Sequence, residues 1–224
     1  MIPKYDVTEG ARIVRLAADQ LLETSSDLKG MAGSDLRRAC GDLRARAEVY
    51  ISDNVIGPKL NDAFDLARQS GATLSEFNHM RERFISEVSD SLVAVLLKNG
   101  CVCFSLQQMS MVIAEMTFTS REDVDMVRDE VNVAFDQAEE AAADEMVLQT
   151  YRTLVGLHAA VTFHLYDTAR PLPQLLRYQF AKPRPTLVLS HRLYDTAARA
   201  DELRNENKVI HPAFAPRAGR ALAF

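Results

Sequence analysis

The residues that could carry metal or acid–base chemistry in this chain are its histidines and its adjacent acidic residues. The 224 residues include five histidines, and no two of them stand at the HExxH spacing that places two metal ligands on one helix face. His158 and His164 are six residues apart, which puts them on different faces of a helix. Glu139 and Glu140 lie in a charge-rich segment that is typical of a solvated helix face. We therefore predict no metal site and no catalytic residue.

The three cysteines, Cys40, Cys101 and Cys103, also give no sign of a site. Their odd number and the lack of CxxC spacing indicate neither a disulfide framework nor a zinc centre. On a helix, Cys101 and Cys103 would lie about 200° apart and could not share one ion. We expect buried free thiols, with a disulfide formed after release into an oxidising medium as the alternative. The sequence also lacks GxSxG, P-loop and GxGxxG patterns, so we expect a protein that is not an enzyme and needs no cofactor.

Helical periodicity dominates the first three quarters of the chain and predicts a mainly α fold. Apolar residues recur every three or four positions after Thr8, which we expect to be an N-cap, and Ser34 can cap a helix over 35–52. Pro58 suits the first turn of a helix over 58–69. The low counts of nine glycines and eight prolines support helices over a strand-and-turn fold.

Longer helices are expected in the middle of the chain. A capping box from Thr73 to Glu76 opens a helix that should run to the Asn-Gly pair at 99–100. The very apolar residues 101–118 should form the central helix of an elongated bundle, with a buried strand as the alternative for the first half of this segment. Either one helix across 119–166 or two helices joined near 142–147 fits the next segment, and we favour the single long rod. No apolar run approaches the roughly 20 residues that cross a bilayer, so we expect no membrane span.

The charge distribution divides the chain into an acidic body and a basic tail. Residues 1–169 hold 16 Lys and Arg against 27 Asp and Glu, whereas residues 170–224 hold 10 against 4. We predict a helical body over 1–169, a proline-rich joint over 170–185 and a small module over 178–224. Because opposite charges attract, the basic tail is expected to dock on an acidic partner. The alternative is that the acidic body and the basic tail are only two solvated surfaces. Nucleic acid is not expected as a partner, because the basic residues are not interleaved with stacking aromatics.

The C-terminal quarter resembles a LysM-type module. The sequence pattern of the LysM two-helix core is Tyr-Gly-Asp, followed further along by an arginine, an apolar residue and an asparagine. In the present sequence no glycine follows the matching tyrosine, Tyr194. Residues 178–180 and 219–224 are similar to the opening and closing strands. The resemblance implies a βααβ module and, as an alternative function, peptidoglycan binding. The matching positions in this sequence are Tyr194, Asp195, Arg199, Leu203 and Asn207.

A more specific resemblance covers residues 119–224. Leu-Pro-x-Leu at 172–175, Thr-Leu-Val-Leu-Ser-His-Arg-Leu-Tyr at 186–194 and Ile-His-Pro-Ala-Phe at 210–214 resemble the C-terminal part of the DNA-circulation (circularisation) proteins of Mu-like phages. That resemblance implies a structural component of a contractile phage tail, at the baseplate or hub. The DNA circularisation that names the family is not expected of these residues.

As a tail component, the protein would be made in the host cytoplasm and become part of the virion. Its expected partners are other tail or baseplate proteins (tube, hub or wedge subunits), which it would meet in multiple copies around the tail axis. No membrane contact is expected. The residues that we expect at the docking surface are Leu193, Tyr194, Arg199, Leu203, Asn207, His211 and Pro212.

Overall fold

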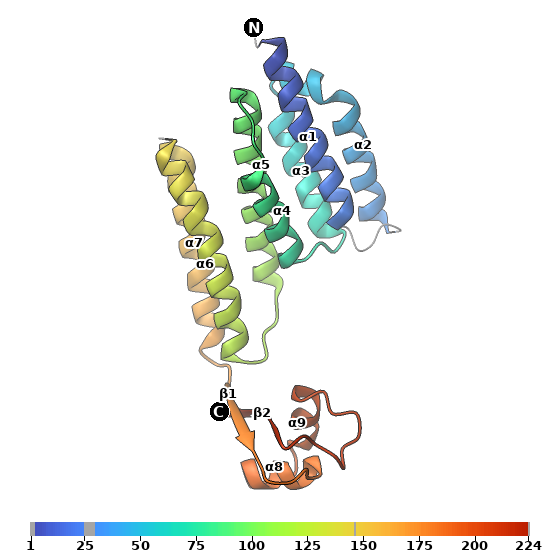
Figure 1. Cartoon of the computed structure of the whole chain (residues 1–224), viewed down its shortest axis with the longest axis vertical. Coiled ribbons are helices and arrows are strands. Elements are labelled where there is room, and N and C mark those ends of the chain that lie inside the picture. Colours follow the sequence, from blue (N-terminus) through green and yellow to red (C-terminus); the bar gives the residue numbers. More distant parts are fainter. Residues whose placement is uncertain (1–2, 25–29, 146, 224) are drawn as a thin grey trace. The chain divides into compact units, whose positions relative to one another are not determined.

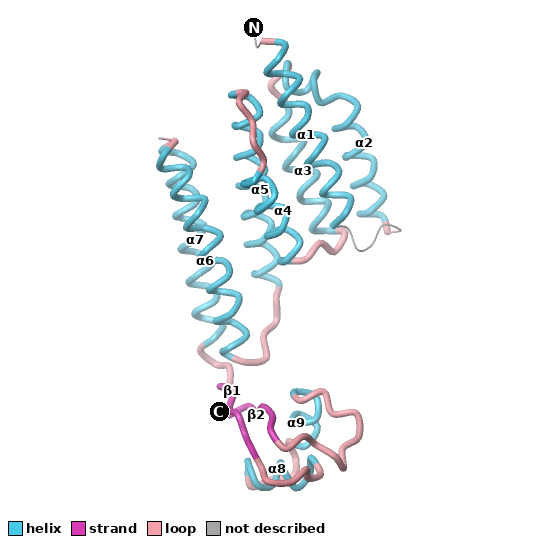
Figure 2. Tube along the Cα trace, viewed as in Figure 1, coloured by secondary structure: helices cyan, strands magenta, loops and turns pink. Residues whose placement is uncertain are grey.

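The computed structural model describes residues 3–24, 30–145 and 147–223. Within these residues the fold is mainly α, as predicted, with nine helices and one two-stranded antiparallel sheet (Figures 1 and 2). The elements in chain order are α1 (Lys4–Thr24), α2 (Met31–Ser52), α3 (Ile56–Gln69), α4 (Leu74–Ser86), α5 (Leu92–Glu115), α6 (Arg121–Asp144), α7 (Leu148–Ala169), β1 (Gln174–Gln179), α8 (Thr186–Tyr194), α9 (Ala200–Glu206) and β2 (Ala218–Ala223).

The chain divides into two compact units. The first consists of Met1–Met116 and Val131–Val161, and the second of Thr117–Glu130 and Thr162–Phe224. Helices α6 and α7 contribute residues to both units. The expected body and tail were divided at residue 169, whereas strand β1 begins at Gln174, inside the range that we predicted as a joint.

The first unit is held together by the packing of its helices around α5. Helices α1, α3 and α4 all contact α5, and α2 packs on α1 and α3. Helix α5 is long and apolar enough to span a membrane by length and composition, although we expected no such segment. Of its most apolar window, 44% is buried, and α1, α3 and α4 pack on this helix. Fully buried side chains of this core include Val14, Leu21, Phe64, Phe77 and Leu106.

Of the three predicted N-caps in this unit, only one is confirmed. Thr73 accepts a hydrogen bond from the backbone N–H of Glu76 at 3.3 Å, and the Glu76 carboxylate accepts one from the backbone N–H of Thr73 at 2.7 Å. Thr8 instead lies inside α1, where its hydroxyl donates to the Lys4 carbonyl. Ser34 lies inside α2, whose N-cap is Gly30. Hydroxyl residues inside a helix can bond to the preceding turn, so a threonine or serine alone does not define a helix start.

The long helix predicted from Thr73 to residues 99–100 is wrong. Helix α4 ends at Ser86, and a new helix begins at Leu92 because Ser91 caps it, accepting from the N–H of Ala94. The hydroxyl of Ser91 also donates to Asp6 of α1 at 2.9 Å, and this bond fixes the break against a neighbouring helix. The Asn-Gly pair at 99–100 does not end α5, since packing of the buried residues on both sides of it overrides the low helix propensity of the pair.

The single rod predicted over 119–166 is also wrong. Helix α6 ends at Asp144 and α7 begins at Leu148, which agrees with the alternative of two helices joined near 142–147, and the two helices lie side by side (Figure 1). Within the first unit, this pairing buries Phe135 and Leu154. The side-chain amide of Asn99 also donates to the Glu145 carboxylate at 2.7 Å, directly at the turn. Burial of two apolar stripes against each other outweighs the continuity of one exposed helix.

The start of α6 is fixed by a reciprocal pair of hydrogen bonds in the second unit. The backbone N–H of Ser120 donates to the Asp123 carboxylate at 3.1 Å, and the N–H of Asp123 donates to the Ser120 hydroxyl at 3.3 Å. Burial acts to raise the pKa of Asp123, but the hydrogen bonds from Thr119 and Ser120 outweigh it and hold this pKa below its ordinary value. The helix start expected near Thr119 is therefore confirmed.

A first prediction tests the capping box. Replacing Thr73 by alanine should lower the free energy of unfolding by about 1 kcal/mol, because the amide of Glu76 loses its acceptor. The matched control is Thr8→Ala, which removes only an exposed bond inside α1 and should change stability by less than about 0.5 kcal/mol. Urea unfolding followed by circular dichroism measures both. Equal losses in the two variants would contradict the assigned caps.

A second prediction concerns the thiols. Cys40 and Cys101 are buried and Cys103 is partly buried. Burial raises the pKa of Cys40 to about 12 and raises the pKa of Cys101 further. Because the thiolate is the reacting form, both should resist alkylation in the folded protein, and Cys103 should react before them. Mass spectrometry after timed alkylation, with denatured protein as the control, gives the three rates; fast labelling of Cys101 would overturn this expectation.

Candidate docking module

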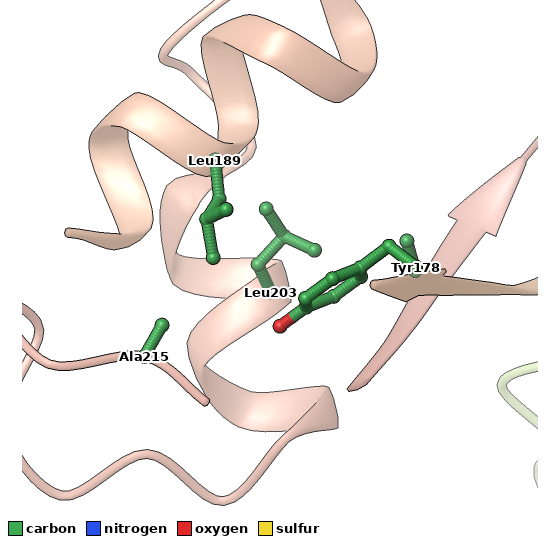
Figure 3. Close-up of a cluster of buried hydrophobic side chains, with 5 residues drawn as sticks. Tyr178, Leu189, Leu203 and Ala215 are labelled. Carbon is green, nitrogen blue, oxygen red and sulfur yellow. The ribbon is translucent and has the colours of Figure 1, made fainter. Parts of the chain in front are cut away.

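The C-terminal segment folds as a small unit of two strands and two helices. Strand β1 pairs antiparallel with β2, in a register that places Gln174 opposite Ala223 and Gln179 opposite Ala218. Side chains from all four elements and from the connecting loop meet in one cluster. Figure 3 shows Leu189 of α8 and Leu203 of α9 pointing toward the ring of Tyr178 on β1. The buried members of the cluster are Tyr178, Leu189, Leu203, Ala215 and Ala221.

The residues at the beginning of this segment are hydrogen-bonded to the start of α6 within the second unit. The backbone N–H of Arg121 donates to the carbonyl of Pro173 at 3.0 Å, and the guanidinium of Arg121 donates to the carbonyl of Leu172 at 2.7 Å. The Glu122 carboxylate accepts from the N–H of Leu175 at 2.8 Å, one residue into β1. The residues after α7 are therefore a bonded connection and not an open linker.

Arg199 joins three elements of the module. Its guanidinium lies 3.9 Å from the centre of the Tyr194 ring, at the end of α8. It donates to the Glu202 carboxylate at 2.7 and 2.9 Å and to the carbonyl of Leu222 on β2 at 2.9 Å. Burial raises the pKa of Tyr194, and the negative charge of Glu202 raises it further. A planar guanidinium can stack on a ring and donate in its own plane at the same time, which a lysine cannot do.

Asn207 joins the end of α9 to β2 in the same way. Its side-chain oxygen accepts from the N–H of Arg220 at 2.7 Å, and its amide donates to the carbonyls of Arg220 at 2.8 Å and Leu203 at 2.9 Å. This approach requires a glycine beside it. A Cβ at Gly219 would lie 2.2 Å from the Asn207 side-chain oxygen and 2.6 Å from the Tyr178 hydroxyl.

The loop over 208–217 is ordered but presents apolar side chains to solvent. The N–H of Thr186 donates to the carbonyl of Pro212 at 2.8 Å, so the loop is held against the first turn of α8. A turn closes between His211 and Phe214, whose rings lie 5.4 Å apart. Ile210 is 94% exposed and Phe214 is 73% exposed. Leu187 on the adjoining turn of α8 is exposed too.

The predicted docking residues therefore fall into two groups. Leu203 is buried in the module's core, and Leu193 packs against that core. Tyr194, Arg199 and Asn207 are partly buried and contact other residues of the module. The remaining two, His211 and Pro212, lie in the exposed loop.

Two features were missed from the sequence. Ile210 and Phe214 flank a His-Pro pair, and apolar residues on both sides of a proline turn were the available signal. The second feature is in the first unit. There Asp136, Glu139 and His158 have possible metal-ligand atoms within 4.8 Å of one another, the one such group found in the described part of the chain. In a single rod, Glu139 and His158 would stand about 28 Å apart at 1.5 Å per residue, so the prediction of one long helix concealed the group.

Neither a comparison with models of known protein families nor one with curated proteins finds a match for this chain.

A third prediction tests the Asn207 contact. Asn207→Ala leaves the amide and carbonyl of Arg220 without their partner, which should cost about 0.5–1.5 kcal/mol and loosen the β1–β2 pair. Asn205→Ala is the matched control, since Asn205 is an exposed asparagine on the same short helix. Hydrogen exchange read by mass spectrometry should show faster exchange across 218–223 in the first variant alone. Unchanged exchange there would contradict a stabilising role for Asn207.

Proposed function

We propose that this chain is a structural component of a contractile phage tail, placed at the baseplate or hub, and that its C-terminal module docks on a neighbouring tail protein. The observation that carries the proposal is the ordered loop over 208–217, which exposes Ile210 and Phe214 on a folded module. Large apolar side chains held at the surface by a fixed turn are typical anchors of protein–protein interfaces. Such a protein acts by docking and spacing its neighbours and performs no catalysis.

The order of elements supports a LysM-like module. The chain runs through a strand, two helices and a second strand, which is the order that the resemblance implies. The two strands pair antiparallel. The glycine that follows the tyrosine in the LysM pattern is missing here, but the backbone of Asp195 adopts the left-handed conformation that this position calls for, with φ 56°. Aspartate is among the few residues that tolerate this conformation. The helix α8 can therefore end as the pattern requires without the glycine.

Charge supports an acidic partner. Residues 170–224 carry 10 Lys and Arg against 4 Asp and Glu. Eight of these cations are exposed, among them Arg177, Lys182, Arg192 and Lys208. We infer that the partner presents an apolar pocket for Ile210 and Phe214 inside an acidic rim, because complementary rim charge guides docking and fixes register.

Peptidoglycan binding is the second candidate function, and the same βααβ order is the observation that favours it. A sedimentation assay distinguishes glycan binding from protein docking. When purified protein is mixed with insoluble cell wall and centrifuged, a tail protein of the proposed kind stays in the supernatant. Sedimentation of the protein with the wall would favour the glycan-binding function instead.

A fourth prediction tests the docking loop in the full chain. Ile210→Ser and Phe214→Ser should leave the fold intact, because both side chains are exposed, yet the variants should be lost from tail particles. Phe163→Ser is the matched control, since Phe163 on α7 is 75% exposed and lies outside the module. Far-UV circular dichroism checks folding, and immunodetection in purified particles measures incorporation.

The expected result is incorporation reduced at least ten-fold for either loop variant, with normal incorporation of the Phe163 variant. Normal incorporation of both loop variants would contradict docking through this loop. Absence of the wild-type chain from purified tails would contradict the proposed function as a whole.

A further inference from the structure

The group Asp136, Glu139 and His158 in the first unit combines an imidazole with two carboxylates. Asp136 and Glu139 are three residues apart on α6 and so share a face of that helix, while His158 comes from α7. The Nδ1 atom of His158 lies 3.0 Å from a carboxylate oxygen of Glu139. Both of these side chains are largely buried, whereas Asp136 is exposed. The ligand atoms of all three lie within 4.8 Å of one another.

The other ring nitrogen of His158 is already engaged. Its Nε2 lies 3.0 Å from the side-chain oxygen of Asn132, and an oxygen acceptor there requires Nε2 to carry its proton. If the imidazole is neutral, its Nδ1 atom carries a lone pair, and this lone pair faces the Glu139 carboxylate. Two acceptors at this distance need a cation between them, either a further proton or a metal ion. The carboxylate of Asp136 adds a second negative charge beside the same position.

The ring is also held in a fixed orientation. Phe135 stacks on His158 with ring centres 4.9 Å apart and planes 8° from parallel. Phe135 is fully buried, so it cannot move aside. A histidine whose second nitrogen donates to an oxygen and whose plane is fixed is the arrangement by which proteins orient metal-ligating imidazoles.

We propose that Asp136, Glu139 and His158 bind a divalent transition-metal ion with a mixed preference for nitrogen and oxygen, such as Zn²⁺. Two ligands that each bind Zn²⁺ at about 2.1 Å can stand about 3 Å apart, as Nδ1 and the Glu139 oxygen do. The exposed Asp136 side chain has the freedom to complete the set. The two carboxylates balance the charge of the ion.

The ion would connect α6 to α7 through ligands from both helices. A ligand that binds the folded protein alone stabilises it in proportion to the logarithm of its concentration over its dissociation constant. Zn²⁺ should therefore raise the melting temperature of the protein, and removal of the ion should lower it. Asn132 is a positioning residue in this site, because it acts on the ion only through the ring of His158.

The test uses the full chain, purified without a histidine tag and stripped of metal. Isothermal titration with Zn²⁺ should give one site in the micromolar range or tighter, together with a rise in melting temperature. His158→Ala and Glu139→Gln should each weaken binding at least ten-fold. Asn132→Ala should weaken it about 10–100-fold, and Asn132→Asp, which keeps an acceptor for Nε2, should restore it.

Two matched controls define the site. Glu140→Gln changes the exposed neighbour of Glu139, and His164→Ala removes an exposed histidine of the same helix as His158; neither should alter the affinity. Circular dichroism must show that each variant is folded, and Glu139→Gln serves if His158→Ala is not. The proposal is overturned by the absence of saturable Zn²⁺ binding, or by binding of unchanged affinity in folded Glu139→Gln.

Discussion

The reversal of the chain between α6 and α7 is the constraint on which both candidate sites depend. In the first unit it brings His158 beside Glu139 and buries Phe135 between the helices. In the second unit it returns the chain to the start of α6, where Arg121 bonds to the carbonyl of Pro173. The first strand of the C-terminal module thus begins from a fixed point. One continuous helix would provide neither the cluster of ligands nor this anchored strand.

The C-terminal module illustrates how a segment of about fifty residues can be ordered with a small core. Five buried side chains form the cluster, and of these only Leu189, Leu203 and Tyr178 are large. Partly buried apolar side chains such as Leu193 pack against this cluster, and polar contacts add to them, because Arg199 and Asn207 each connect a helix to the backbone of β2. Hydrogen bonds are directional, so these bonds fix how the two helices lie on the sheet. Ile210 and Phe214 of the 208–217 loop lie outside this core and are exposed, which leaves them available to a partner.

Local signals in the sequence predicted part of the local structure. The Thr73–Glu76 capping box is as expected, because it depends on neighbouring residues alone. The errors arise where a tertiary contact decides. Helix α5 continues through the Asn-Gly pair at 99–100 because burial on both sides overrides propensity. The break before it depends on Ser91 reaching Asp6, a residue far away in the sequence. For the same reason the metal-ligand group was missed, since its spacing is meaningful only after the helices fold back on each other.

The two proposed binding features rest on different chemistry and lie in different compact units. Metal binding requires charged and imidazole ligands, and Asn132 and Phe135 set the orientation of the imidazole; it responds to chelation. Docking through Ile210 and Phe214 requires apolar contact area, which responds to neither. The hydrogen bonds that hold the loop, from Thr186 to Pro212 and from Ala215 to Arg184, lie wholly inside the second unit. Loss of the ion would therefore weaken the α6–α7 pairing without altering the docking surface itself, so any effect of metal on assembly would have to act through the stability of the helices.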